Sequence, residues 1–336
     1  MVDSAPAVPA SQVVIPGRPD RVLVLGPGRS GTRWLATAMG HAVGTRLVKE
    51  PDNVDANPQG RGPGRLGFGP YPMIEATDAA PQFRALWDLA FAARVPNQAG
   101  WRIAAGRAAL RLPRTVRDPL LRRTAQAISA LPGRAPHVVV KSIYAPFYAE
   151  WLVRNYDPKV VVIQRNPLNV ISSWIDVGMH GFDLLDRPVI RERYLDPLGL
   201  PAQTGDRTPL QEAARCIGLI TMVLAEHLAQ HPEWLLVTHE DLCVDPVVRI
   251  REVCERAGLP WSDDVRRFLQ ESDRPGTGFS NVRVTREQPT RWRGRLDDQQ
   301  VAEITEILGR FPTRGWIRPP IGAEDPSDAE RLRTSG

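Results

Sequence analysis

The chain has 336 residues, of which 42% are hydrophobic and 24% are charged. These proportions are typical of a globular protein and are sufficient for one large domain or two small ones. The net charge of +5 favours an anionic ligand. It does not indicate nucleic-acid binding, because the basic residues are spread along the chain without a dense block of Lys and Arg.

The sequence carries no signal for a disulfide framework, a metal site or a membrane anchor. Its three cysteines include no CxxC pair. No run of about 18 apolar residues and no signal-peptide core occur, so we expect a cytoplasmic protein without a membrane span. Residues 1–20 are predicted to be a flexible leader and residues 319–336 a flexible tail, which leaves one domain over residues 21–318. The oligomeric state is not indicated.

Short β-rich segments alternate with helical segments along this domain. Strands are predicted at residues 21–25, 45–48, 137–141, 159–164 and 234–238. Helices are predicted at residues 31–40, 146–155, 167–177, 209–231, 246–257, 262–272 and 297–311. This alternation predicts an α/β fold with a parallel sheet covered on both faces. Ligands of such sheets bind at the carboxyl ends of the strands.

A glycine-rich loop follows the first predicted strand. Gly26, Gly28 and Gly31 allow backbone N–H groups to turn towards one point, and the N-terminus of the next helix adds its dipole. The loop therefore predicts a phosphate site, with a plain strand-to-helix turn as the alternative. In the GxxxxGK[ST] loop of nucleoside-triphosphate enzymes a lysine follows the last glycine. Here Thr32 takes the place of that lysine, and Arg33 that of the magnesium-binding hydroxyl.

Two segments resemble the cofactor-binding motifs of sulfotransferases that depend on 3′-phosphoadenosine 5′-phosphosulfate (PAPS). Residues 21–35, RVLVLGPGRSGTRWL, resemble the family's 5′-phosphosulfate loop. Residues 160–174, VVVIQRNPLNVISSW, resemble its 3′-phosphate segment, which implies that Arg165 and Ser173 hold the 3′-phosphate. The chemistry agrees, because a guanidinium binds phosphate oxygens in a forked geometry and a hydroxyl adds a donor.

Two later segments match the same family in the expected order. Residues 238–260, THEDLCVDPVVRIREVCERAGLP, resemble its YEDL…DP…GL segment, with His239 in place of tyrosine. Residues 290–296, TRWRGRL, resemble the WR…L segment of the carbohydrate sulfotransferases. The resemblance implies a P-loop-like parallel sheet of about five strands, PAPS as the sulfuryl donor and no metal.

The branch of the family determines which residue is expected to be the general base. The cytosolic phenol and steroid enzymes use a histidine in a K-T-H strand end, but here the strand ends Lys141-Ser142-Ile143. The carbohydrate (Golgi-type) branch places a glutamate after the second strand in a segment like FEP, and this chain has VKEP. Similarity to that branch and its bacterial relatives implies that Glu50 is the base. His180 is an alternative base, and Glu50 could instead be a solvated loop residue.

Further roles follow from the charge that builds up in an in-line displacement. Arg29 is expected at the 5′-phosphate and Lys141 at the sulfuryl oxygens, so both join Glu50 as catalytic residues. A surface arginine and a lysine paired with a structural carboxylate are the alternatives. The expected cofactor-binding residues are Gly28, Arg29, Ser30, Gly31, Thr32, Arg33, Arg165, Ser173 and Arg293.

The acceptor is not readable from the sequence. Residues 54–136 interrupt the alternation of strands and helices, with weaker helical patterns near residues 81–95 and 115–131. We interpret them as an insertion that shapes the site of a small hydroxyl acceptor, which is a carbohydrate, a glycolipid or a natural product. Two other functions remain open: a P-loop kinase for a small molecule and a non-catalytic nucleotide-binding protein. A kinase needs a γ-phosphate lysine and a Walker-B aspartate, and neither stands at the expected position.

Overall fold

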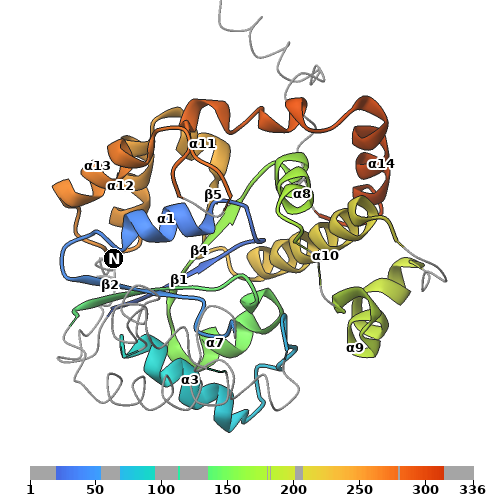
Figure 1. Ribbon diagram of the computed structural model, residues 1–336. Helices are drawn as coiled ribbons and strands as arrows, with labels where there is room; N and C mark the ends of the chain where they lie inside the picture. Colours follow the sequence, from blue (N-terminus) through green and yellow to red (C-terminus); the bar gives the residue numbers. More distant parts are fainter. Residues whose placement is uncertain are drawn as a thin grey trace, which may run out of the picture.

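The computed structural model confirms the predicted parallel sheet. It describes residues 20–53, 69–94, 113, 135–179, 181, 183–200, 207–278 and 281–313. Its strands are β1 (Asp20–Leu25), β2 (Thr45–Lys49), β3 (His137–Lys141), β4 (Lys159–Gln164) and β5 (Leu235–Thr238). They pair in the order β2-β3-β1-β4-β5, and every pairing is parallel (Figure 1). All carboxyl ends of the strands therefore meet at one edge.

The two faces of the sheet are buried in two apolar cores. In β1, Val22 and Val24 belong to one core, and Leu23 and Leu25 belong to the other. This alternation is the two-residue period of a strand that is covered on both sides. The helices α1 (Thr32–Met39), α12 (Pro246–Arg256) and α13 (Asp263–Ser272) contribute to the first core. The helices α3 (Pro81–Phe91), α7 (Ala149–Tyr156), α8 (Pro167–Asp176), α10 (Pro209–Gln230) and α14 (Asp298–Leu308) contribute to the second.

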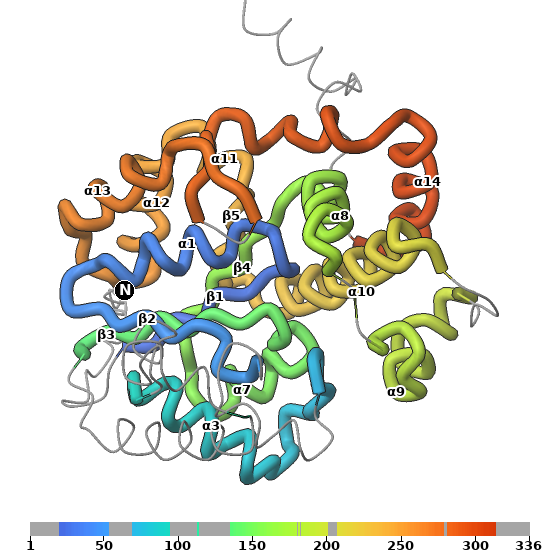
Figure 2. The backbone as a smooth tube through the Cα atoms, viewed as in Figure 1, coloured from blue at the N-terminus to red at the C-terminus, as the bar shows by residue number. Residues whose placement is uncertain are grey.

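Helix α10 is the longest of the described helices, with 22 residues. It begins at a capping box, in which Thr208 accepts a hydrogen bond from the Gln211 amide and the Gln211 side chain accepts one from the Thr208 amide. Helices α8 and α14 pack along it (Figure 2). No helix in the described part of the chain has the length and apolar character needed to cross a membrane.

The segment that interrupts the sequence pattern supplies a core helix. The predicted helix near residues 81–95 is α3, and its Phe83 and Trp87 rings contact the Tyr148 ring with centroid distances of 5.0 and 6.0 Å. The helix predicted at 115–131 lies outside the described residues. The division into leader, domain and tail, and the acceptor-shaping role of residues 54–136, stay predictions.

Short helical turns complete the fold. They are η2 (Ala145–Tyr148), η3 (Leu184–Asp186), α9 (Pro188–Ile190), η4 (Arg191–Leu195), η5 (Asp196–Leu198), α11 (His239–Val244), η6 (Thr285–Glu287) and η7 (Arg291–Gly294). Prolines limit several of them, since proline starts a helical turn but cannot continue one. The segment between α13 and α14, which contains η6 and η7, runs across the top of the view in Figure 2.

Candidate functional site

The glycine loop wraps tightly at the carboxyl end of β1. Gly26 and Gly31 have φ values of 154° and 98°, in the region that favours glycine. A Cβ atom at Gly26 would lie 2.6 Å from the Ile163 carbonyl oxygen, and one at Gly31 would lie 2.4 Å from Cδ2 of His239. The indole Nε1 of Trp174 donates a hydrogen bond of 2.8 Å to the Gly28 carbonyl and so holds the loop against α8. The predicted loop is thus a compact turn that leads directly to the N-terminus of α1.

A cavity of about 460 Å³ opens over this loop and the neighbouring strand ends. The predicted site residues that line it are Gly28, Arg29, Gly31, Thr32, Arg33, Glu50, Lys141, Arg165 and Ser173. Ser30 does not line it, because its side chain is fully buried; its Oγ has no hydrogen-bond partner in the structure. His180 lies outside the described residues. Residues from four strand ends that are far apart in the sequence therefore meet around one cavity.

The glycine loop and the segment after β4 are directly hydrogen-bonded. Arg29 Nε donates to Ser173 Oγ at 2.9 Å, and one terminal nitrogen of Arg165 donates to the Arg29 carbonyl at 3.0 Å. The other terminal nitrogen of Arg165 donates to the Gln288 carbonyl at 3.2 Å. The Nε of Arg165 is buried and has no partner. Because the two hydrogen bonds of Arg165 go to neutral carbonyl groups, they do not neutralise its buried charge, so this geometry favours an anionic ligand beside it.

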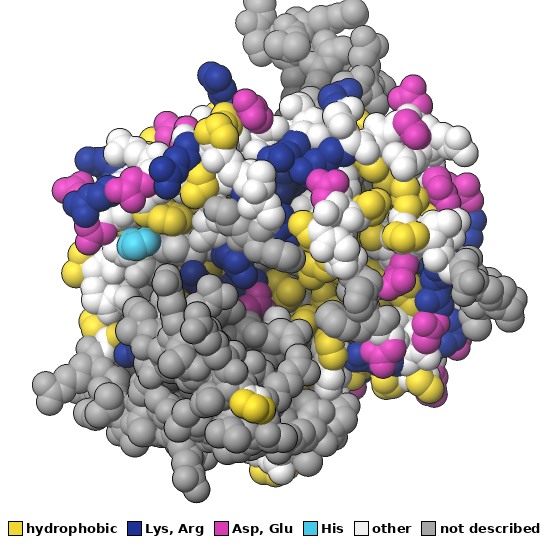
Figure 3. All heavy atoms as spheres, in the orientation of Figure 1, with side chains coloured by type: hydrophobic (Ala, Val, Ile, Leu, Met, Phe, Trp, Pro, Cys, Tyr) yellow, Lys and Arg dark blue, Asp and Glu magenta, His cyan; other side chains and the backbone are white. Residues whose placement is uncertain are grey.

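Three arginines that the sequence analysis did not select add positive charge to the cavity. Arg283, Arg291 and Arg295 line it and come from the segment between α13 and α14. Burial, followed by the charges of Arg283 and Arg165, lowers the pKa of Arg29 to about 10, and burial lowers that of Arg165 to about 10. Lys and Arg side chains gather across the upper middle of the face shown in Figure 3. Guanidinium groups that repel one another around a cavity fit a ligand with several negative charges.

Arg293, which was expected at the cofactor, is not among the lining residues. Its guanidinium lies over the Trp292 ring, 4.7 Å from the ring centroid, while Arg291 and Arg295 line the cavity. The three arginines belong to the same predicted segment, TRWRGRL, in which Arg291–Gly294 form the turn η7. The sequence therefore predicted the segment correctly, but it did not predict which of its arginines face the cavity.

Two aromatic rings line another part of the cavity. The ring of Trp34 in α1 lies beside that of His239 in α11, with ring centroids 6.1 Å apart and ring planes at 59° to each other. The indole Nε1 of Trp34 donates to Ser272 Oγ at 3.2 Å, which fixes the ring. Burial, and then the charge of Arg165, lowers the pKa of His239 well below its ordinary value, so this ring is neutral. Flat, neutral rings of this kind can stack on a nucleobase.

Glu50 and Lys141 form a buried ion pair at the cavity wall. Lys141 Nζ donates to Glu50 Oε1, and the two residues are 4% and 5% exposed, respectively. The Glu50 amide donates to the Lys141 carbonyl at 2.7 Å, and the Ile143 amide lies 3.4 Å from Glu50 Oε2. The structure thus contradicts the alternative of a solvated Glu50. Lys141 does pair with a carboxylate, and that carboxylate is the expected base.

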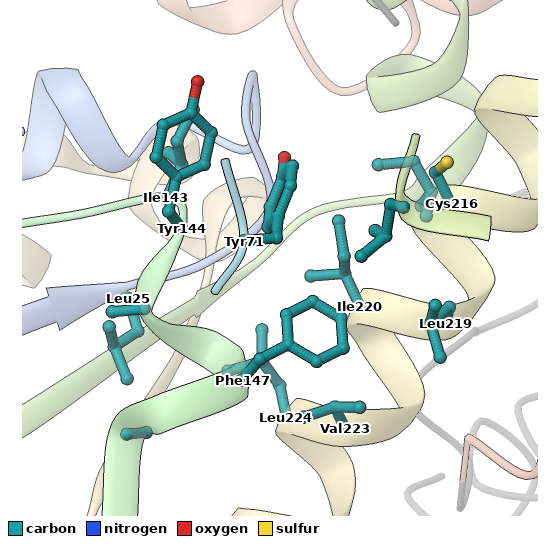
Figure 4. Packing of buried hydrophobic residues seen from close by; sticks show 14 of the residues in the cluster. Leu25, Tyr71, Ile143, Tyr144, Phe147, Cys216, Leu219, Ile220, Val223 and Leu224 are labelled. Atoms are coloured by element: carbon teal, nitrogen blue, oxygen red, sulfur yellow. The ribbon is translucent and has the colours of Figure 1, made fainter. Parts of the chain in front are cut away.

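The wall beside this ion pair is apolar. Ile143, Tyr144 and Met179 line the cavity there. Tyr144 packs edge-on against Tyr71 with a centroid distance of 4.8 Å. Figure 4 shows both hydroxyl groups pointing in the same direction, away from Phe147. Within the described ranges, no group of three or more His, Cys, Asp and Glu side chains is placed to hold a metal ion.

The sequence of residues 19–263 matches the sequence pattern of the sulfotransferase family. The chain belongs to the sulfotransferase family. It is therefore a transferase of sulfuryl groups in general terms, and the resemblance to sulfotransferases is confirmed. The assignment to the carbohydrate branch stays a prediction. No protein with curated function matches the chain in sequence.

Several solved sulfotransferase structures resemble this one at low sequence identity. The sulfotransferase domain from the curacin biosynthetic pathway has 14% identity and a TM-score of 0.46, and the match covers 87% of this chain and 98% of that domain. The sulfotransferase domain of the Synechococcus PCC 7002 olefin synthase has 15% identity and a TM-score of 0.46, with 88% and 97% covered. A mouse sulfotransferase complexed with PAP, the desulfated cofactor, has 12% identity and a TM-score of 0.42, with 94% and 89% covered.

Proposed function

We propose that this sulfotransferase moves a sulfuryl group from PAPS to a hydroxyl group of a small-molecule acceptor. The observation that carries this proposal is the junction of two anion-binding elements in one cavity. The glycine loop at the N-terminus of α1 is one, and Arg165 with Ser173 is the other. The hydrogen bond of 2.9 Å from Arg29 to Ser173 joins them. A ligand with phosphates on both the 3′ and the 5′ oxygen of one ribose fits this arrangement better than a ligand with a single phosphate.

The residues present fit PAPS in each of its parts. The loop from Gly28 to Thr32 would hold the 5′-phosphosulfate, since helix N-termini bind phosphate through backbone N–H groups. Arg165, which lines the cavity, would carry the positive charge that faces the 3′-phosphate, and Arg291 adds charge nearby. The rings of Trp34 and His239, which are tilted by 59° to each other, would offer apolar surfaces against which the adenine could stack.

The chemistry follows from an in-line displacement at sulfur. PAPS supplies the sulfuryl group: the acceptor oxygen forms a bond to sulfur while the bond from sulfur to the 5′-phosphate oxygen breaks, and PAP leaves. Glu50 accepts the proton of the acceptor hydroxyl. Arg29 stabilises the charge that grows on the 5′-phosphate, and Lys141 stabilises the sulfuryl oxygens. As Glu50 becomes neutral, its attraction for Lys141 weakens. The ammonium group of Lys141 is then free to stabilise the sulfuryl oxygens.

The acceptor belongs to the class of carbohydrates, glycolipids or natural products. The VKEP segment supports the carbohydrate branch, because it places a glutamate where that branch has one. The apolar wall of Ile143, Tyr144 and Met179 supports an acceptor with an apolar or ring surface beside its hydroxyl group. Such a surface could be the face of a sugar ring, a lipid or an aromatic ring.

Mass spectrometry of reaction products tests this function. The protein is incubated with PAPS and a panel of glycans, glycolipids and phenolic metabolites, without added metal. The expected result is a product heavier than its acceptor by one SO₃ group, formed in step with PAP. The matched control is Glu50→Gln, which should bind PAP but form far less product. Transfer of phosphate from ATP to an acceptor, with no transfer from PAPS, would contradict the proposal.

A further inference from the structure

The turn that carries Glu50 is held by a buried hydrogen-bond network that the proposed chemistry does not use. Glu50 lies directly after β2 with φ 50°, in the left-handed region that is unfavourable for residues other than glycine. A conformation of this kind persists only where the surrounding structure holds it in place. Pro51, which follows, cannot donate a backbone hydrogen bond, so the next polar group available to hold the turn is Asp52.

Asp52 connects the turn after β2 to the segment after β3. Its Oδ2 accepts hydrogen bonds from the Ser142 hydroxyl at 2.6 Å and from the Tyr148 hydroxyl at 2.5 Å. Ser142 Oγ in turn accepts from the amides of Tyr144 and Ala145 at 3.1 and 3.2 Å. Because Ala145 begins the helical turn η2 that ends at Tyr148, these bonds form a closed ring. Ser142 directly follows Lys141, so the ring ties together the chain segments of both members of the ion pair.

Tyr148 is itself fixed from the opposite side. Its ring packs against Phe83 and Trp87 of α3, and its hydroxyl is the donor to Asp52. Burial, followed by the charge of Asp52, raises the pKa of Tyr148 well above its ordinary value, so the hydroxyl stays protonated and remains a donor. The position of Asp52, and through it the turn of Glu50, is therefore set by the aromatic core under the sheet.

The network includes a buried carboxylate that lowers the stability of the fold, which argues for more than a structural role. Asp52 is 7% exposed, and its Oδ1 is buried without a hydrogen-bond partner. Burial, and then the charge of Glu50, raises the pKa of Asp52 to about 6, so at neutral pH the fold carries an incompletely satisfied buried carboxylate. Groups that lower stability in this way are concentrated at functional sites.

We infer that Asp52 is a positioning residue, which fixes the orientation of Glu50 through its hydrogen bonds with Ser142 and Tyr148. This inference rests on the proposed function, since it assumes that the orientation of Glu50 matters for turnover. Asp52 does not line the cavity and touches neither donor nor acceptor. Its effect on catalysis would pass through Pro51, the single residue that separates it from Glu50.

The test compares two variants that each lose one tyrosine hydroxyl group, in the consecutive helical segments η2 and α7. Tyr148→Phe removes one donor to Asp52 and leaves the aromatic packing intact. The matched control is Tyr156→Phe in α7, which removes hydrogen bonds of 3.0 Å to Asp88 and 3.1 Å to the Arg84 carbonyl, remote from Glu50. We expect kcat at saturating substrates to fall about three- to tenfold in Tyr148→Phe and to stay within about twofold in Tyr156→Phe, because small displacements of a base are costly. Equal kcat values in the two variants would overturn the inference.

Changes at Asp52 give a graded series. Asp52→Asn keeps an oxygen that accepts from both hydroxyls, and Asp52→Ala does not. We expect kcat to fall roughly 10- to 100-fold in Asp52→Ala and by less in Asp52→Asn, with the affinity for PAP within about twofold of wild type in both. Combined with Glu50→Gln, Asp52→Ala should cause no further loss of kcat, because residues that act through one another are not additive. A full additional loss in the double variant would overturn the inference.

Hydrogen exchange separates failure of this inference from failure of the proposed function. The Glu50 amide is bonded to the Lys141 carbonyl at 2.7 Å and reports the turn without any need for catalysis. We expect faster exchange at this amide in Tyr148→Phe than in Tyr156→Phe. If Glu50→Gln retains full kcat, the assignment of the base is wrong, but faster exchange still supports the positioning of the turn by Asp52. Unchanged exchange in Tyr148→Phe would overturn it, whichever residue is the base.

Discussion

Glu50 and Lys141 contact one another at the ends of adjacent strands. Lys141 closes β3 opposite Lys49 in the register of β2, and the chain continues from Lys49 directly to Glu50. The ion pair is therefore a consequence of the parallel pairing of β2 with β3, and it is nearly inaccessible to water. The proposed base, Glu50, and the proposed cation for the sulfuryl oxygens, Lys141, thus neutralise one another before the reactants bind.

Removal of Lys141 should destabilise the fold strongly. Lys141→Met leaves the Glu50 carboxylate buried without its partner, which we expect to lower the free energy of unfolding by about 3–5 kcal/mol. The double variant Lys141→Met/Glu50→Gln should regain a large part of this loss, because no buried charge remains. Urea denaturation at neutral pH measures both values. A single variant that loses less than about 1 kcal/mol would show that the pair is not buried as the structure has it.

Glu50→Gln should abolish most of the turnover without changing cofactor binding. The amide keeps the size of the side chain but cannot accept the proton, and a positioned base is worth roughly 10²–10⁴-fold in kcat. Steady-state rates at saturating PAPS and acceptor measure the effect. His180→Ala is the comparison variant, because His180 is the alternative base, and it should do much less. The reverse ranking of the two variants would move the base to His180 and remove support for the carbohydrate branch.

The two anion-binding elements should respond differently to mutation. Arg165→Ala and Ser173→Ala remove the proposed contacts to the 3′-phosphate, which is remote from the reacting sulfur, and should chiefly weaken cofactor binding. Arg29→Ala removes a charge beside the bond that breaks and should lower kcat even at saturating PAPS. Comparison of kcat with the KM for PAPS in the three variants separates the roles. An Arg29→Ala enzyme with wild-type kcat and a raised KM would show that Arg29 binds the cofactor without assisting the transfer.

Asp52 should leave a signature in the pH dependence of stability. Its pKa is raised from an ordinary value of 3.8 to about 6 in the fold, so the folded state binds the proton more tightly than the unfolded state. Stability from this group is full below pH 3.8 and is lost as the pH rises to about 6, by at most about 3 kcal/mol. Asp52→Asn cannot titrate. The stability of this variant relative to wild type should therefore improve across that window and stay constant above it, as measured by denaturation at a series of pH values.

Much of the fold, and many of the residues that line the cavity, could be predicted because their signals are local. The VVV runs of β3 and β4, each bounded by turn residues, predicted both strands with their observed bounds. The glycine spacing predicted the loop. Arg165 and Ser173 are eight residues apart on one strand–helix unit, so one segment of sequence contained both.

The remaining features depend on contacts between distant segments. Asp52 and Tyr148 are 96 residues apart, and their hydrogen bond exists only because β2 and β3 are neighbours in the sheet. Arg283 reaches the cavity because the segment between α13 and α14 passes over the strand ends. The turn η7 decides that Arg291 and Arg295, and not Arg293, line the cavity. No spacing in the sequence carries that information.

Calorimetric titration with PAP and with 5′-AMP, both without magnesium, tests the central claim most directly. The claim is that one cavity binds two phosphate groups of a single adenosine, at the glycine loop and at Arg165. Loss of the 3′-phosphate leaves the buried Arg165 guanidinium without an anionic partner, which should cost roughly 2–5 kcal/mol, or about 30-fold to several thousand-fold in affinity. PAP should therefore bind far more tightly than 5′-AMP, and Arg165→Ala should remove most of the difference. Equal affinity for the two nucleotides, or binding only in the presence of magnesium, would contradict the account.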